Sequence, residues 1–349
     1  MNVFILFFTF YFLAILCDKY FVPALEVLAE KLRMNSEVAG ATLMAVGSSA
    51  PELFTSLFAV FQSTESLSLG AGTIVGSALF NVLVIVGVSA MYMTSKQKLA
   101  WQPVIRDMVF YCFAIILLLT FFWDGKVYLW EGLSLVSVYV LYVFMVKNWA
   151  KWFKYDVQDF SEEFDVPEEE NDGIVSKTLQ KVLDIIIPDT HSKYILSFIV
   201  SIILIAGASY LMVESAVEVA HALNIPGAII GLTVLAIGTS VPDLMSSIIV
   251  AKKGKADMAV SNAVGSNVFD VFIGLGLVYV VFFTLVDRSA EFIVVDTNNL
   301  VSSILLLFAT VLALIFLLVL QKWRLGKYSG MFLVGLYVSY LVYNVIKVL

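Results

Sequence analysis

Residues 47–52 read GSSAPE, and residues 238–243 read GTSVPD. Each hexapeptide interrupts a long apolar run with a proline, which removes a backbone donor and disfavours a continuous helix. Each also carries a glycine, which adds backbone freedom, and ends on a carboxylic acid. The two stretches therefore predict two broken helices that carry acids at equivalent positions.

The similarity between these stretches extends well beyond the hexapeptides. Residues 40–57 (GATLMAVGSSAPELFTSL) align with 231–248 (GLTVLAIGTSVPDLMSSI), and residues 72–87 (GTIVGSALFNVLVIVG) align with 261–276 (SNAVGSNVFDVFIGLG). The offset changes from 191 to 189 residues between the two alignments, so a two-residue difference lies in the loop between them. The chain is thus predicted to contain an internal repeat.

The composition places the repeat in a membrane. Of the 349 residues, 60% are hydrophobic and 14% are charged, whereas soluble domains carry about 25% charge. The apolar residues form long runs, and a run of roughly 20 residues spans a bilayer as a helix. We therefore predict an all-α integral membrane protein with ten transmembrane helices. They are expected near residues 3–17, 36–61, 67–91, 104–123, 127–147, 194–213, 223–251, 258–284, 299–320 and 329–348.

Basic residues support this helix count. With ten spans, 18 of the 21 Lys and Arg residues fall in one set of alternate loops and 3 fall in the other. Cytoplasmic loops collect Lys and Arg, so both termini are predicted to be extracellular in a multi-pass protein of the cell membrane. Each repeat lies in a half with five helices, residues 1–147 and 194–349. Because five is odd, the two halves are predicted to be inverted repeats.

The segment between the halves, residues 148–193, is predicted to be a cytoplasmic acidic loop. Its acids supply much of the net charge of −7, which argues against nucleic acid as a partner. Their spacing does not fit an EF-hand, so a solvated linker is favoured over a Ca²⁺ sensor. Residues 174–187 are predicted to form a short amphipathic helix at the membrane face. The two cysteines indicate neither a disulfide framework nor a metal–thiolate site, and no cofactor or protein partner is indicated.

The broken helices supply the parts of a cation site. A helix break at membrane depth frees carbonyl oxygens, which are tolerated only where protein or a bound ion satisfies them. A carboxylate at that depth costs at least about 2.5–3.5 kcal/mol, so two at equivalent positions indicate function. Carboxylates, hydroxyls and carbonyls are hard oxygen ligands, which favour Ca²⁺ over zinc or copper. The oxygen-bearing residues at the two breaks are Ser48, Ser49, Glu52, Thr239, Ser240 and Asp243.

The second pair of aligned stretches adds polar residues to the same region. Ser77 and Asn81 in the third span correspond to Ser266 and Asp270 in the eighth. If Glu52, Asp243 and Asp270 are all ionised, one Ca²⁺ leaves a single negative charge uncompensated. A monovalent cation at Asp270 would neutralise it, or Asp270 would hold a proton.

At these motifs the chain resembles the Ca²⁺/cation antiporter superfamily. The stretches GSSAPELFTSL, GTIVGSALFN, GTSVPDLMSSI and GSNVFD, together with CDKYFVPALEVLAEKL at residues 17–32, are most similar to the K⁺-dependent Na⁺/Ca²⁺ exchanger branch. The short central loop leaves no room for large Ca²⁺-sensing domains, which suggests a compact, prokaryotic form. The motifs cover roughly a third of the chain, and the ten-helix layout extends the resemblance to nearly all of it.

The resemblance implies a function and a role for each site residue. Na⁺ entry would drive Ca²⁺ out by alternating access, with K⁺ carried alongside Ca²⁺ in that branch. Glu52 and Asp243 would bind Ca²⁺ together with the backbone carbonyls of Ser48 and Thr239. Asp270 would take K⁺ or a proton. The Na⁺ sites would be lined by Ser49, Ser77, Ser240, Ser266 and Asn81.

Three alternatives stay open at this point, and the third choice is a cation channel, which would pass single-channel current without counter-ion dependence. An H⁺/Ca²⁺ exchanger on the same fold would use the carboxylates as proton carriers. A more distant alternative is an intramembrane aspartyl protease with Asp243 and Asp270 as its dyad, but Glu52 and the inverted repeat would then have no role. We therefore favour the interpretation that the protein is a transporter without enzyme activity.

Overall fold

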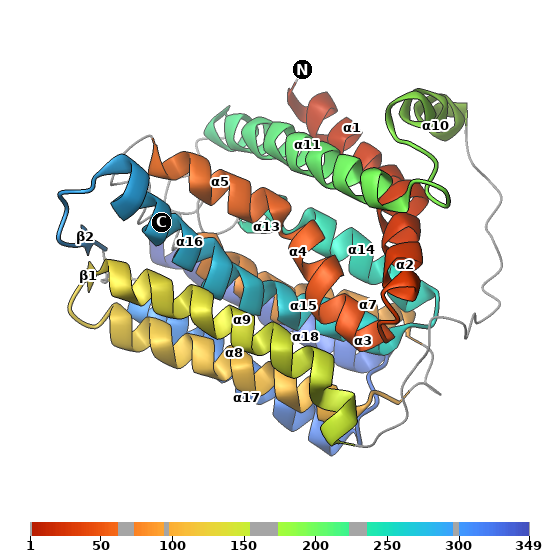
Figure 1. The fold of residues 1–349 in the computed structure, drawn as a ribbon. Helices are drawn as coiled ribbons and strands as arrows, with labels where there is room; N and C mark the ends of the chain where they lie inside the picture. Colours follow the sequence, from red (N-terminus) through yellow and green to blue (C-terminus); the bar gives the residue numbers. More distant parts are fainter. Residues whose placement is uncertain are drawn as a thin grey trace.

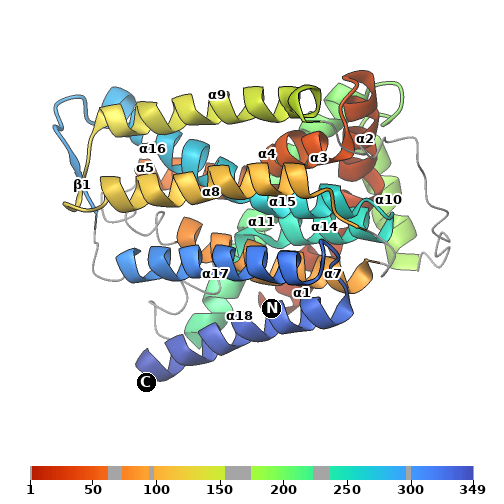
Figure 2. The same cartoon turned by 90° about the horizontal axis from the view of Figure 1, so that it is seen from below.

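The computed structural model describes residues 2–61, 73–93, 98–153, 174–222, 236–295 and 300–348. Apart from one two-stranded sheet, the elements in these ranges are helical and form a bundle (Figures 1 and 2). Six described helices are long and apolar enough to cross a bilayer, which agrees with a multi-pass membrane protein. They are Thr73–Tyr92, Trp101–Phe121, Leu129–Trp152, Tyr194–Met212, Ala256–Val286 and Ser302–Leu320.

The first half begins with one continuous helical segment, since helical backbone joins α1, a π-helical turn and α2. It extends past the predicted end near residue 17 because helical hydrogen bonding continues beyond the apolar run. The elements are α1 (Asn2–Leu16), η1 (Cys17–Phe21), α2 (Val22–Lys31), α3 (Ser36–Ala39), η2 (Gly40–Met44), α4 (Ala45–Ser48), α5 (Ala50–Val60), η3 (Asn81–Ile85), α7 (Val86–Tyr92), α8 (Trp101–Phe121), β1 (Lys126–Val127) and α9 (Leu129–Trp152).

The second half follows a short helix, α10, that lies within the predicted central loop and confirms the amphipathic helix expected there. Most of that loop's acidic residues fall outside the described residues. The elements are α10 (Ile174–Ile186), α11 (Tyr194–Ala222), α13 (Ala236–Thr239), α14 (Val241–Lys252), α15 (Ala256–Phe269), η5 (Asp270–Leu275), α16 (Gly276–Val281), η6 (Phe282–Val286), β2 (Ile293–Val294), α17 (Leu300–Leu320) and α18 (Lys327–Val348).

The two predicted helix breaks are present. Ser49 separates α4 from α5 with φ −84° and ψ 9°, and Ser240 separates α13 from α14 with φ −86° and ψ 5°. Two π-helical turns also start at equivalent positions, η3 at Asn81 and η5 at Asp270. Such turns are rare and gather at functional sites, so the helix irregularities of the two halves coincide with the repeated motifs.

Helix α15 forms the centre of the bundle, and all of its residues are buried. It contacts the first half at two glycines that allow backbones to meet. A Cβ on Gly40 would lie 2.5 Å from the carbonyl oxygen of Met258, and a Cβ on Gly265 would lie 2.8 Å from the Cα of Ala41. These small residues bring the broken helix of the first half directly against α15 of the second.

A repeat that the sequence comparison missed links α9 to α18. Residues 132–142 (GLSLVSVYVLY) and 330–340 (GMFLVGLYVSY) share glycine, Leu-Val and two tyrosines at an offset of 198 residues. Each stretch packs on a glycine of the opposite half, and the two sets of contacts are equivalent. A Cβ on Gly276 would meet Gly132, Leu135 and Val136, and a Cβ on Gly87 would meet Gly330, Leu333 and Val334.

The tyrosines of this repeat make matching aromatic contacts. Tyr139 meets Phe269 edge-on with ring centroids 5.6 Å apart, and Tyr337 meets Phe80 edge-on at 5.5 Å. Phe80 and Phe269 are themselves equivalent in the two halves. Aromatic pairs of this geometry stabilise packing, so the same contact holds the last helix of each half.

Loops tie the ends of the bundle together in two places. At one end β1 pairs with β2 in antiparallel fashion, and the Val295 N–H donates to the carbonyl oxygen of Gly125 at 3.0 Å (Figure 1). The other tie joins the loops that precede α8 and α18, where the Leu99 N–H donates to the Trp323 carbonyl oxygen at 2.8 Å. Both ties join a loop of the first half to a loop of the second.

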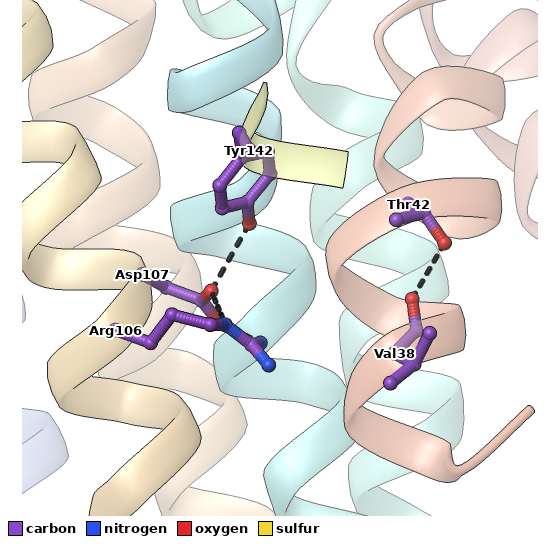
Figure 3. Close-up of polar contacts among 5 residues, drawn as sticks. All are labelled: Val38, Thr42, Arg106, Asp107 and Tyr142. Carbon is purple, nitrogen blue, oxygen red and sulfur yellow. Dashed lines mark hydrogen bonds and ion pairs between the residues drawn. The ribbon is translucent and has the colours of Figure 1, made fainter. Parts of the chain in front are cut away.

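One buried ion pair lies within α8. Arg106 and Asp107 form a salt bridge at 2.7 Å, and the Tyr142 hydroxyl donates to Asp107 at 3.1 Å (Figure 3). Because each charge is compensated, this group joins α8 to α9 without leaving an isolated charge in the interior. Figure 3 also shows the Thr42 hydroxyl of η2 bonded to the Val38 carbonyl of α3. These two oxygens lie 2.6 Å apart.

The close contact between α7 and α18 can be tested with two glycines of one helix. Gly330→Ala would push a methyl group against the Gly87 carbonyl, whereas Gly335 has open space around it. We expect Gly330→Ala to destabilise the protein by about 1–3 kcal/mol through overpacking. The measurement is thermal unfolding in detergent, with Gly335→Ala as the matched control. Equal melting temperatures for the two variants would contradict this packing.

Candidate ion-binding site

The helix breaks place two acids at the starts of two helices. Glu52 lies in the first turn of α5 and Asp243 in the first turn of α14. The amino-terminal end of a helix carries a partial positive charge, which favours a carboxylate there. The sequence pattern of a proline one residue before the acid therefore gives each carboxylate the same local support.

Each acid is contacted by a residue from the other half of the chain. The Ser240 hydroxyl, at the second break, donates to Glu52 Oε1 at 3.0 Å. Asn81 Nδ2 donates to Asp243 Oδ2 at 3.3 Å, and the Ser266 hydroxyl donates to Asp243 Oδ1 at 3.0 Å. The predicted convergence of the two repeats is thus present in the interior of the bundle.

The acids of this region are buried without a basic partner. Glu52 is 2% exposed, and Asp243 and Asp270 are fully buried. Among the described residues, no Lys or Arg forms an ion pair with any of the three. A buried carboxylate without a partner is costly, so the arrangement requires either a proton or a bound cation.

Several oxygen atoms here accept no hydrogen bond within the described part of the chain. They are buried, and they come from both breaks and both π-helical turns. An oxygen that receives no donor is available to a cation, and Ca²⁺ and Na⁺ prefer such ligands. The atoms are Glu52 Oε2, Ser49 Oγ, Asn81 Oδ1 and both carboxyl oxygens of Asp270.

Three of the predicted hydroxyls bond back to their own helices. Ser48 Oγ donates to the Met44 carbonyl at 2.7 Å and Ser77 Oγ donates to the Ile74 carbonyl at 3.1 Å. Thr239 Oγ1 lies 3.5 Å from the Ala236 carbonyl. A hydroxyl that donates to its own helix offers an ion its lone pairs, and the residue adds its backbone carbonyl. Ser48 and Thr239 also contact the opposite half, at Asn262 and Glu52 respectively.

Two asparagines on α15 complete the network and were not predicted. Asn267 accepts from Asn81 Nδ2 at 2.9 Å and donates to the Ala78 carbonyl at 3.2 Å. Asn262 donates to Ser247 at 2.8 Å and lies 3.4 Å from the Ser48 hydroxyl. Both are fully buried. The signal available in the sequence was a pair of amides in a predicted membrane span, since buried amides need partners.

Asp270 lies at the edge of this network. It interacts electrostatically with Glu52 and Asp243, and with Tyr111 of α8 and Tyr139 of α9. Within the described residues, no three His, Cys, Asp or Glu side chains lie close enough together to hold a metal ion. An ion at the centre would therefore depend on neutral oxygens as well as on carboxylates.

Comparison with known proteins identifies the family. The family described as sodium/calcium exchanger protein matches residues 2–147 and 193–346. The chain is 30% identical to the human sodium/potassium/calcium exchanger 2, over 96% of this chain and 76% of that protein. It is 29% identical to the chicken sodium/potassium/calcium exchanger 1, over 99% of this chain and 78% of that protein.

A solved structure shares the fold. The sodium-calcium exchanger NCX_Mj, in crystals soaked with Na⁺ and Sr²⁺, superposes with a TM-score of 0.70 at 23% identity, covering 98% of each chain. The relatives are exchangers, so the protease alternative finds no support. The chain therefore belongs to the sodium/calcium exchanger family of membrane antiporters and is a transporter of ions rather than an enzyme.

Proposed function

We propose that this protein uses the entry of Na⁺ to export Ca²⁺ from the cell by alternating access. The observation that carries the proposal is the pair of buried acids, Glu52 and Asp243, each hydrogen-bonded to a residue of the opposite half. Both carboxylates are available to one ion only while the two halves stay together.

Ca²⁺ binds between the two breaks in this proposal. Helix α4 ends at Ser48 and α13 ends at Thr239, and the last carbonyls of a helix lack intrahelical donors. These ends also carry a partial negative charge, which favours a cation. Glu52 and Asp243 then supply the two negative charges that a divalent ion requires.

Na⁺ competes for the same ligands. The hydroxyls and amide around the acids, Ser49, Ser77, Ser240, Ser266 and Asn81, provide neutral oxygens for monovalent ions. Because Na⁺ and Ca²⁺ share the carboxylates, occupancy by one displaces the other. Competition at a shared site is what couples the two fluxes.

Asp270 takes K⁺ or a proton in this scheme. Within the described residues, both of its carboxyl oxygens lack a hydrogen-bond partner and no basic side chain forms an ion pair with it. The relatives named sodium/potassium/calcium exchanger favour K⁺ as the partner ion. A third negative charge beside the Ca²⁺ site is the physical reason for an additional monovalent ion.

We further propose ten spans in two inverted halves, residues 1–147 and 194–349, joined by a cytoplasmic loop over 148–193. The duplicated contacts of α9 and α18 support this arrangement, because an inverted repeat predicts that equivalent helices meet equivalent partners. The distribution of Lys and Arg supports extracellular termini.

The first and sixth spans are the proposed movers. Helices α1 and α11 pack against one another along one side of the bundle and carry none of the proposed ligands (Figure 1). Phe21 stacks on Phe198 at 5.5 Å, and a Cβ on Gly47 would lie 2.6 Å from the Phe21 ring. The two spans thus cover the first break, where a sliding movement would open or close the site.

Flux into vesicles tests the proposal directly. Purified protein in Na⁺-loaded vesicles should take up radioactive Ca²⁺ only while an outward Na⁺ gradient exists. Glu52→Gln and Asp243→Asn should each lower the uptake at least about tenfold, since Ca²⁺ affinity follows the charge of the ligands. Glu214→Gln, an exposed acid on α11, is the matched control and should leave uptake unchanged.

The same vesicles separate the coupling ions. Removal of external K⁺ should lower uptake by the wild type but not by Asp270→Asn, if K⁺ binds at Asp270. Uptake that follows a pH gradient and ignores Na⁺ would instead establish H⁺/Ca²⁺ exchange. Wild-type rates in both Glu52→Gln and Asp243→Asn would remove the site assignment.

Stability without ions tests the difference between positions 81 and 270. Asn81→Asp removes two donated hydrogen bonds and adds an acid beside Asp243, so we expect a loss of about 2 kcal/mol or more. Asp270→Asn removes an unpartnered buried acid and should be neutral or stabilising. The measurement is thermal unfolding in detergent with choline replacing Na⁺, K⁺ and Ca²⁺.

The double variant, Asn81→Asp with Asp270→Asn, restores the wild-type number of acids. If the hydrogen bonds donated by Asn81 determine the stability of the protein, the double variant should remain less stable than the wild type. A double variant as stable as the wild type would show that only the number of acids matters.

A further inference from the structure

The short helix α10 lies outside the bundle of spanning helices, at the end where α2 and the start of α11 lie (Figure 1). Only residues 187–193 separate it from α11, whose first part, Tyr194–Met212, is long and apolar enough to cross a bilayer. A connection this short keeps α10 close to the membrane surface.

One side of α10 is fixed to the first helical segment. Leu183 is 1% exposed and Ile187 is 3% exposed. The Tyr20 hydroxyl, from η1, donates to Asp184 Oδ1 at 2.8 Å and lies 3.1 Å from the Gln180 carbonyl oxygen. The orientation of α10 about its own axis is therefore set by protein contacts.

The opposite side of α10 is aliphatic and uncovered in the described part of the protein. Val182, Ile185 and Ile186 are 51%, 86% and 51% exposed. Side chains three and four residues apart lie on one face of a helix, so these three form a single apolar face. The first two turns of α11 expose further aliphatic residues, as a lipid-facing helix does. They are Ile195, Leu196 and Ile199.

Basic residues border this face. Lys177 and Lys181 are exposed and lie two turns and one turn before Ile185, in the same row of the helix. The polar hollow on the other side, between α10 and η1, is lined by Asp184 and Asp189 and by one cation, Lys19, so acids outnumber basic residues there. Positive charge beside an aliphatic face, with acids directed elsewhere, fits an anionic lipid surface.

We propose that α10 is an interfacial helix whose aliphatic face, Val182, Ile185 and Ile186, inserts into the membrane surface, where Lys177 and Lys181 bind the phosphates of anionic phospholipids. The occupant of this face is lipid, because the face continues toward a spanning helix and the charges match. The orientation proposed above assigns this surface to the cytoplasmic leaflet.

Helix α10 is linked to the first helix break through its contact with Tyr20. Tyr20 precedes Phe21, whose ring packs on Gly47 beside the first break. Lipid bound to α10 therefore holds the part of the first segment that covers the break. This consequence rests on the proposed function, whereas the insertion of α10 does not.

Lipid contact can be measured without transport. After Cys17→Ala and Cys112→Ala, an environment-sensitive fluorophore is attached to Ile185→Cys in vesicles that contain phosphatidylglycerol. We expect its emission to shift to the blue and to be quenched by nitroxides near the glycerol end of lipid acyl chains. The same fluorophore on His191→Cys, in an exposed loop, should be quenched by aqueous iodide instead.

The other possible occupants give different results. Quenching of the Ile185→Cys probe by iodide to the extent seen at His191→Cys would overturn the proposal. Protection from both quenchers would also overturn it, because a protein segment, such as the acidic loop or a second copy, would then cover the face. Val182→Cys gives a second position on the same face if the first variant does not fold.

The lysines are tested by varying the fraction of phosphatidylglycerol. Each lysine near an anionic surface is expected to strengthen binding about fivefold. Lys177→Gln with Lys181→Gln should therefore move the midpoint of the blue shift to a much higher phosphatidylglycerol fraction, and high salt should do the same to the wild type. Lys151→Gln, an exposed lysine at the end of α9, is the control. An unchanged midpoint in the double variant would refute the role of these lysines.

Discussion

The structure depends on the burial of carboxylates that form no ion pair with a basic residue in the described part of the chain. Glu52, Asp243 and Asp270 are all inside the bundle, and an isolated buried charge is among the least favourable groups a protein can contain. Hydroxyl and amide donors and the amino-terminal ends of α5 and α14 reduce the cost but do not supply a full positive charge. In the proposed cycle the transported ion supplies this positive charge, so the binding of either Na⁺ or Ca²⁺ lowers the cost of burying the acids.

Such a site needs a stiff frame, because its ligands come from both halves of the chain. The frame consists of repeated contacts: Gly87 against Gly330, Gly276 against Gly132, and an edge-on Phe–Tyr pair on each side. Loop ties join the halves again outside the helices. The pair α1 and α11 takes no part in these contacts and packs instead on the helices of the two breaks, α5, α13 and α14.

Much of this arrangement was predictable because proline and carboxylates have strong local consequences. The breaks at Ser49 and Ser240 were predicted from Pro51 and Pro242, and their convergence followed from the repeat. The equivalence of α9 and α18 was missed because it rests on scattered positions, yet the shared Leu-Val and tyrosine spacing would have revealed it.

Other features were beyond prediction for physical reasons. Asn262 and Asn267 have Thr73 and Ala78 at the equivalent positions, so comparison of the repeats gives no signal for them. The π-helical turns depend on a one-residue change of hydrogen-bond register, which composition does not encode. The Ser48 and Ser77 hydroxyls donate to carbonyls of their own helices. Packing selects these side-chain rotamers, and the sequence alone does not specify them.

At the position shared by Asn81 and Asp270, the first half carries a neutral amide and the second half carries an acid. Their surroundings are alike, since each follows a phenylalanine that meets an equivalent tyrosine. Asn81 donates to both Asp243 and Asn267, which an ionised aspartate could not do, and an aspartate here would add a fourth acid to Glu52, Asp243 and Asp270. An exact duplication would therefore have been unstable at this position. In the proposed function the retained acid, Asp270, carries the charge that one Ca²⁺ leaves over. The asymmetry of a single side chain would then separate a site for the divalent ion from a site for a monovalent ion or a proton.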